Sequence, residues 1–133
     1  FYIMKTELNL DSSQDVQDIS DIILKNYVRG GREGMSILME PAFHKNATIH
    51  GHMNTNLLAG PIQILFDWVD ANSPAVNLKA DIINIDLVNT IATARVELRE
   101  WLGSHYTDQF TLLKENNKWT ITSKVFHLYG RGS

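Results

Sequence analysis

One carboxylate lies where a β-strand is expected to bury it. Asp108 shares the alternating phase of Tyr106, Phe110 and Leu112, so the pattern aims its side chain at the apolar face of the strand. An isolated buried charge is too costly, so this carboxyl must be hydrogen-bonded, paired or protonated. Burial can raise the pKa of a carboxyl by up to about 3–5 units, which leaves a neutral acid that can donate a hydrogen bond to a developing oxyanion. The alternative is a structural carboxylate paired with Lys124 or with a backbone amide.

The histidines are the candidates for a general base. His50 and His52 stand two residues apart on one expected strand, and imidazole titrates near neutral pH. A catalytic zinc would need a third protein ligand, for which His44, His105 or an acid would have to lie nearby. Most histidines in a chain of this size satisfy hydrogen bonds, so we expect no metal site.

Two other motifs carry no chemistry. Gly30-Gly31 lacks the spacing of a phosphate-binding loop, and Ser104 lacks the context of a nucleophile elbow. The sequence therefore predicts neither a nucleotide cradle nor a hydrolase triad, and no cofactor is expected.

Length and composition narrow the classes of protein further. The chain has 133 residues, a formal net charge of −3 and no cysteine. We expect a single domain over residues 1–133, with an ordered core at about 12–128. The charge balance argues against nucleic acid and against an anionic membrane as partners, and no apolar run is long enough to span a bilayer. The absence of cysteine fits a reducing compartment, so a cytoplasmic location is expected.

The first half of the sequence predicts three helices that position these residues. The first begins at Ser12 or Ser13 and ends at Gly30-Gly31, the second runs from Gly34 to Glu40, and the third runs from Pro61 to Ala71. The apolar positions at helical spacing are Val16, Ile19, Ile23 and Tyr27 in the first helix and Ile62, Leu65, Phe66 and Val69 in the third.

After Pro74 the apolar period changes from 3.6 to 2, which predicts strands. A phase slip near Ile82-Ile83 predicts a β-bulge, and three turn sequences further on predict hairpins of an antiparallel sheet. Trp101 falls in the polar phase, which indicates either an exposed tryptophan at a dimer interface or a bulge that returns it to the core. Helices followed by hairpins predict an α+β fold, with helices covering one face of a curved sheet.

Three stretches carry a family resemblance, namely Tyr27–Gly34, Phe43–Ile49, and Tyr106–Lys114 with Trp119–Ile121. The chain resembles the nuclear transport factor 2-like superfamily, which includes ketosteroid isomerase, scytalone dehydratase and SnoaL-like cyclases. Within it, the C-terminal motifs are most similar to the putative lumazine-binding proteins. The resemblance implies a cone-shaped α+β barrel, with three N-terminal helices packed on a strongly curved antiparallel sheet.

The resemblance to ketosteroid isomerase also implies site residues. It places Asp108 at the position of the acid that stabilises the oxyanion and Tyr27 at the position of its tyrosine partner. The position of the general base falls on Gly51, with no carboxylate nearby. If Gly51 faces the cavity, strand alternation sends His50 and His52 to the other face unless a bulge intervenes.

We therefore expect first a small-molecule-binding protein, with Asp108 and Tyr27 as polar groups at an apolar cavity. The alternatives are an isomerase, dehydratase or cyclase, with Asp108, Tyr27, His50 and His52 as tentative catalytic residues, and a dimeric protein-interaction scaffold. The expected partners are a small apolar or aromatic ligand and a second copy bound through the sheet. The residues expected at the ligand are Tyr27, Met39, Phe43, Trp68, Asp108, Phe110, Phe126 and His127.

Overall fold

The structure, a computed structural model, describes residues 12–131 of the chain. This part begins with a long helical segment. It consists of α1 (Ser12–Asp21), a π-helical stretch (Ile22–Val28) and α2 (Arg29–Glu33), which follow one another without a break. Three of the four predicted stripe residues are fully buried, whereas Val16 is 41% exposed, so the prediction was wrong for Val16.

The helical segment ends at Gly34 rather than at the predicted Gly30-Gly31. Gly34 has a φ of +68° in the left-handed region, and its N–H caps the carbonyls of the last turn. Gly30 and Gly31 are buried inside α2, where side chains of other segments pack closely against them. A Cβ on Gly31 would lie 2.7 Å from Cζ2 of Trp101. These two glycines therefore allow close packing and do not terminate the helix.

Two shorter helices follow. α3 (Ser36–Met39) continues into a 3-10 turn over Glu40–Ala42, close to the predicted helix. α4 (Gln63–Ala71) begins two residues later than predicted, because Pro61 is the last residue of a strand. The four apolar positions predicted for this helix are all buried.

The strands form one six-stranded sheet in the order β2-β1-β6-β5-β4-β3. Their bounds are β1 (Phe43–Met53), β2 (Asn56–Pro61), β3 (Lys79–Val88), β4 (Ile91–Trp101), β5 (Ser104–Glu115) and β6 (Lys118–Arg131). All pairs are antiparallel except β1 with β6, which run parallel. The sequence pattern did not indicate β2, and the parallel pair departs from the purely antiparallel sheet that was expected.

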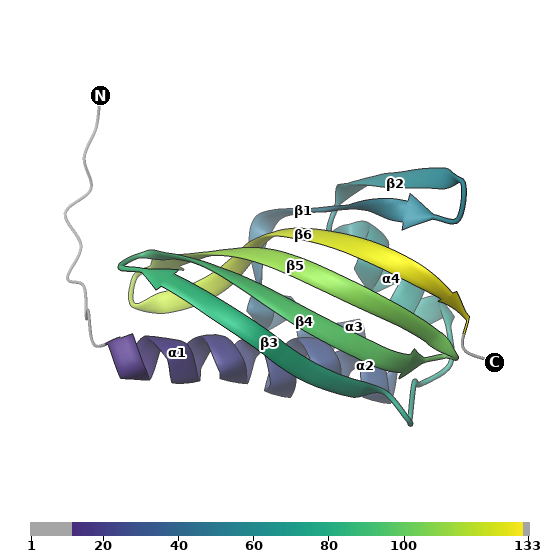
Figure 1. Ribbon diagram of the computed structural model, residues 1–133, viewed down its shortest axis with the longest axis horizontal. Helices are drawn as coiled ribbons and strands as arrows, with labels where there is room; N and C mark the ends of the chain where they lie inside the picture. Colours follow the sequence, from purple (N-terminus) through teal and green to yellow (C-terminus); the bar gives the residue numbers. More distant parts are fainter. Residues whose placement is uncertain (1–11, 132–133) are drawn as a thin grey trace.

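The sheet is curved but does not close, and the helices pack against one of its faces (Figure 1). The buried apolar residues lie between that face and the helices and form one cluster. The α+β cone with N-terminal helices is confirmed.

Irregularities in the strands decide which side chains face the core. The pairing of β3 with β4 shifts between Ile82 and Asn84, which confirms the predicted bulge, but Ile83 itself is exposed. A second shift between Leu98 and Trp101 turns Trp101 inward, where it is 4% exposed. Of the two possibilities weighed for Trp101, the bulge is correct and the exposed interface residue is wrong.

Candidate functional site

Three polar side chains meet inside the core. Asp108 is fully buried, and its Oδ2 accepts a hydrogen bond from the Tyr27 hydroxyl. Its Oδ1 lies 3.3 Å from Nζ of Lys124, which is also buried. The predicted pairing of Asp108 with Tyr27 and the alternative pairing with Lys124 therefore both occur. They form one network, which we call the Lys124–Asp108–Tyr27 triad.

Each member of the triad is positioned by a different local feature. Asp108 lies in the middle of β5 and pairs with Val96 on one side and Phe126 on the other. Tyr27 comes from the π-helical stretch, a rare geometry that is frequent at functional sites. Lys124 faces inward because β6 carries an extra residue at Thr122, which reverses its alternation.

Burial shifts the ionisation of this network. It raises the pKa of the Asp108 carboxyl, although the Lys124 ammonium and the Tyr27 hydrogen bond act in the opposite direction. Burial, reinforced by the Asp108 carboxylate, raises the pKa of Tyr27 well above its ordinary value. Tyr27 is therefore a hydrogen-bond donor at neutral pH, and Asp108 accepts a proton more readily than an exposed aspartate does.

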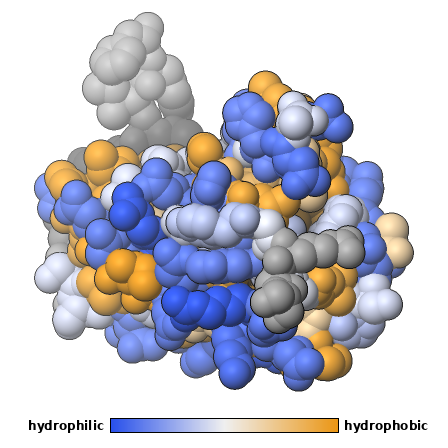
Figure 2. Space-filling model, turned by 45° about the vertical axis from the view of Figure 1, so that its right-hand side comes forward, coloured by the Kyte–Doolittle hydropathy of each residue, from blue (hydrophilic) through white to orange (hydrophobic). Residues whose placement is uncertain are grey.

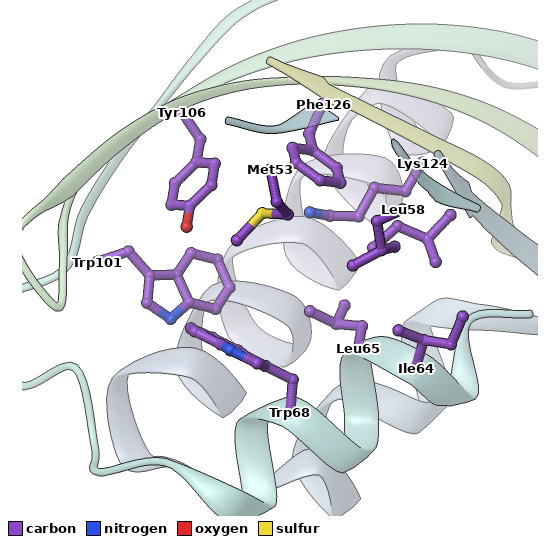
Figure 3. Close-up of a pocket in the computed structure, with 10 residues that line it drawn as sticks. Met53, Leu58, Ile64, Leu65, Trp68, Trp101, Tyr106, Lys124 and Phe126 are labelled. Atoms are coloured by element: carbon purple, nitrogen blue, oxygen red, sulfur yellow. The ribbon is translucent and has the colours of Figure 1, made fainter. Parts of the chain in front are cut away.

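An apolar cavity lies beside the triad (Figure 3). Its volume is about 90 Å³, whereas a single water needs roughly 10–15 Å³. Its walls come from β1, β2, α4, β4, β5 and β6, through Ile49, Met53, Leu58, Ile64, Leu65, Trp68, Trp101, Tyr106, Lys124 and Phe126.

Lys124 is the triad member that reaches this cavity. Its side chain runs along the wall with the nitrogen toward Met53 (Figure 3), and Nζ lies 5.0 Å from the centre of the Phe126 ring. Asp108 and Tyr27 are not among the residues that line the cavity, and both stand behind the amine. A ligand in the cavity would therefore meet the ammonium first.

A second hollow adjoins the cavity. It measures about 350 Å³ and shares Met53, Trp68, Trp101 and Tyr106 with the inner cavity. Its other walls include polar side chains such as Asn54, Asn72 and Ser104. The shared residues show that the two hollows adjoin, and we call the first one the inner cavity.

The aromatic residues predicted at the ligand divide into two groups. Trp68 and Phe126 line the cavity. Phe43 and Phe110 instead pack edge-on against the Tyr27 ring, with centroids 5.8 and 5.3 Å away. They support the triad from behind, and neither lines the cavity.

Met39 and the histidines lie away from the cavity. Met39 is fully buried among the helices, and His127 is exposed in a groove on the outer face of the sheet. His50 and His52 are exposed on β1 and alternate with Ile49 and Met53, which line the cavity. The structure therefore does not bring either of these imidazoles to the triad, as alternation implied.

Gly51, the position that the resemblance gives for a general base, has no room for a side chain. A Cβ there would lie 2.5 Å from Cδ1 of Phe126, so the ring would have to shift for any larger residue. Within residues 12–131, no group of three or more His, Asp or Glu side chains is placed to hold a metal ion.

Several cavity residues were not among those predicted from the sequence. Tyr106 shares the strand phase of Asp108, a signal that could have identified it. Lys124 was considered only as a partner of Asp108, although it stands two residues before Phe126 and so on the same face of a strand. Leu58 lies on β2, which was not predicted, and nothing in the pattern marked it.

Comparison with solved structures supports the same fold. An NTF2-like protein of unknown function from Shewanella baltica OS155 is 40% identical, with a TM-score of 0.85 over 92% of this chain and 99% of that one. A second one, from Methylobacillus flagellatus KT, is 41% identical, with a TM-score of 0.83 over 96% and 99% of the two chains. A ketosteroid isomerase-like protein from Erwinia carotovora atroseptica has a TM-score of 0.66 at 9% identity, which is a likeness of fold alone.

One curated relative has a named activity. Aldolase FrzH from Cladobotryum sp. is 32% identical over 107 residues, which cover 79% of this chain and 85% of that protein. In the part of this chain that the structure describes, no helix has both the length and the apolar character needed to cross a bilayer.

The family model described as putative lumazine-binding matches residues 14–127, nearly the whole described chain. The chain therefore belongs to the putative lumazine-binding family of NTF2-like proteins.

Proposed function

We propose that this protein binds a small, mostly apolar molecule in the inner cavity, with a polar group of the ligand at the Lys124 amine. The observation that carries the proposal is an apolar cavity whose wall holds one buried ammonium group, backed by a carboxylate. Largely apolar pockets with a few convergent polar groups are the usual form of small-molecule sites. The family description, putative lumazine-binding, supports a ring-shaped ligand.

The triad defines what such a ligand would offer. The Lys124 ammonium is a donor, so the ligand would present an acceptor, such as a carbonyl oxygen, at that end. Asp108 and Tyr27 hold the amine in place and do not themselves touch the ligand in this arrangement. Trp68 and Trp101, whose ring centres are 6.1 Å apart, would contact the rest of the ligand where the two hollows meet.

A thermal-shift screen of lumazine, pterins and one-ring carbonyl compounds tests the proposal. A ligand at 100 times its Kd stabilises the protein by about 2.7 kcal/mol. Leu58→Trp would fill the cavity from β2 and is expected to abolish the shift, whereas Leu57→Trp, a matched change at an exposed neighbour, is expected to keep it. Equal shifts in the two variants would contradict binding at this site.

An enzyme of the isomerase, dehydratase or cyclase kind is the second candidate. It is favoured by the raised pKa of Asp108, which burial causes, and by the resemblance to an aldolase, whose name indicates a carbonyl substrate. The exposed His50 and His52 give no support to a histidine base, so any proton transfer would fall to the triad.

We propose further that two copies associate through the outer face of the sheet. That face carries a groove of about 290 Å³ in which Val125 and Tyr129 are 46% and 57% exposed. In the view of Figure 2 the surface shows apolar side chains in separate patches among polar ones. Light scattering of wild type and Val125→Glu tests this contact, and it also tests the scaffold alternative.

A cytoplasmic location stays a prediction.

A further inference from the structure

The amine of Lys124 is unusual among the lysines of the described chain because it is buried and lines a cavity. Its side chain is 6% exposed, and it is the one lysine among the ten residues of the cavity wall. The surrounding wall is apolar, so a small molecule there has few other polar groups to meet. Buried lysines of this kind serve as Schiff-base nucleophiles toward carbonyl substrates.

We propose that Lys124 Nζ forms an imine with an aldehyde or ketone that enters the inner cavity. This inference rests on the proposed function, because it takes the same ligand site and names the covalent step. The substrate class is a carbonyl compound with an apolar body of about one ring, since the other walls are aliphatic and aromatic.

The triad supplies the proton transfers that the step requires. The Lys124 ammonium first passes a proton to Asp108 Oδ1, 3.3 Å away, which leaves a neutral amine. The amine nitrogen attacks the carbonyl carbon, the C–N bond forms, and the electrons of the C=O π bond move to oxygen. That oxygen takes a proton from the attacking nitrogen, which gives a neutral carbinolamine.

Loss of water completes the imine. Asp108 returns its proton to the carbinolamine hydroxyl, the C–O bond breaks and water leaves. The nitrogen lone pair forms the C=N bond, so ketone and ammonium become protonated imine and water, with charge conserved. Tyr27 acts as a positioning residue, because its hydroxyl donates to the other oxygen of Asp108 and holds the carboxyl toward Lys124.

A second buried lysine provides a matched control. Lys114 pairs with Asp15 at 2.8 Å and is 3% exposed, but it lines none of the three hollows described above. A small carbonyl compound therefore cannot reach it through any of these three hollows. Reactivity at Lys124 but not at Lys114 would follow from the cavity, since both lysines are buried and paired.

The experiment traps the imine on the whole protein. Wild type is incubated with benzaldehyde or cyclohexanone and sodium cyanoborohydride, and the adduct is located by intact-mass and peptide mass spectrometry. We expect the adduct on Lys124, a loss of it in Lys124→Arg, and its retention in Lys114→Arg. Arginine keeps the charge beside the carboxylate but forms no imine under these conditions, and mapping on wild type needs no variant to fold.

Binding is read separately from trapping. Benzyl alcohol has the ring without the carbonyl, and its thermal shift in wild type and Leu58→Trp reports on the cavity alone. A cavity-dependent shift without an adduct on Lys124 would overturn the imine and leave the proposed function standing. No shift and no adduct would overturn both, and adducts confined to the exposed lysines would overturn the imine.

Discussion

Two buried lysine–aspartate pairs stand in different surroundings in this protein. Lys114 and Asp15 join β5 to α1, with a nitrogen–oxygen distance of 2.8 Å and a further hydrogen bond from the Trp119 indole at 3.0 Å. Lys124 and Asp108 join β6 to β5 at 3.3 Å, with Tyr27 as the further donor. Both pairs are almost completely buried, so charge and burial alone do not distinguish them.

The difference lies in what each amine faces. Lys114 lines none of the described hollows, whereas the Lys124 amine forms part of a cavity wall. A buried ion pair enclosed by protein can only hold elements together, because neither partner can exchange its contact. A pair beside a cavity can exchange one contact for a ligand. We therefore infer a structural role for the first pair, whereas the ligand-binding role proposed above belongs to the second.

The largest expected effect is a loss of stability when the Lys114–Asp15 pair is broken. Lys114→Met leaves the Asp15 carboxylate buried without its countercharge, and breaking such a pair costs about 3–5 kcal/mol of unfolding free energy. Urea denaturation measures the loss. Lys118→Met, at an exposed neighbouring lysine, is the control and should stay within about 0.5 kcal/mol of wild type. A loss for Lys114→Met no larger than the control's would contradict the structural role.

The same substitution at the cavity is expected to cost less stability. In Lys124→Met, Asp108 keeps the hydrogen bond from Tyr27 and can take up a proton, because burial raises the pKa of Asp108. We expect a loss of about 1–2 kcal/mol. Ligand-induced thermal shifts with carbonyl compounds should weaken in this variant but not in a folded Lys114 variant. Equal stability losses for the two lysines would remove the distinction between the pairs.

The smallest expected effect is on the pH dependence of stability. Burial raises the pKa of Asp108 in the folded protein above the ordinary 3.8. At pH values between 3.8 and the raised pKa, the folded state therefore binds more protons than the unfolded state. The stability of wild type relative to Asp108→Asn should therefore fall as pH rises from below 3.8 through the raised pKa. Denaturation at several pH values gives this difference.

Asp70 provides a control of opposite sign. Hydrogen bonds from the Ser36 side chain and backbone lower the pKa of Asp70 below 3.8. Wild type relative to Asp70→Asn should lose stability as pH falls through that lowered value. The same slope in both comparisons would contradict a raised pKa at Asp108.

Much of the site could be predicted where the periodic pattern is regular. Asp108 shares the phase of buried neighbours, so its burial followed from strand alternation alone. Its pairing with Tyr27 followed from the family resemblance, since the two residues lie 81 positions apart and no local pattern joins them. The cavity residues Trp68 and Phe126 were expected as aromatic residues, whereas Leu58 was missed together with β2.

The alternating pattern was least decisive where one residue breaks the period. Trp101 and Lys124 both face inward because a strand carries an irregularity just before them, at Leu98–Trp101 and at Thr122. An alternating pattern cannot locate such a slip when the residues around it are polar. At Ile82-Ile83, where apolar residues stand on both sides of the slip, the pattern did reveal it.

The sequence by itself determined the α+β order, the family and the burial of Asp108, because local periodicity and motif spacing are properties of the chain that need no distant contact. Only the tertiary structure decided that Lys124 forms part of the cavity wall while Asp108 and Tyr27 stand behind it. That arrangement depends on how β6, β5 and the π-helical stretch meet, and such long-range packing leaves no repeating signal in the residues that make it.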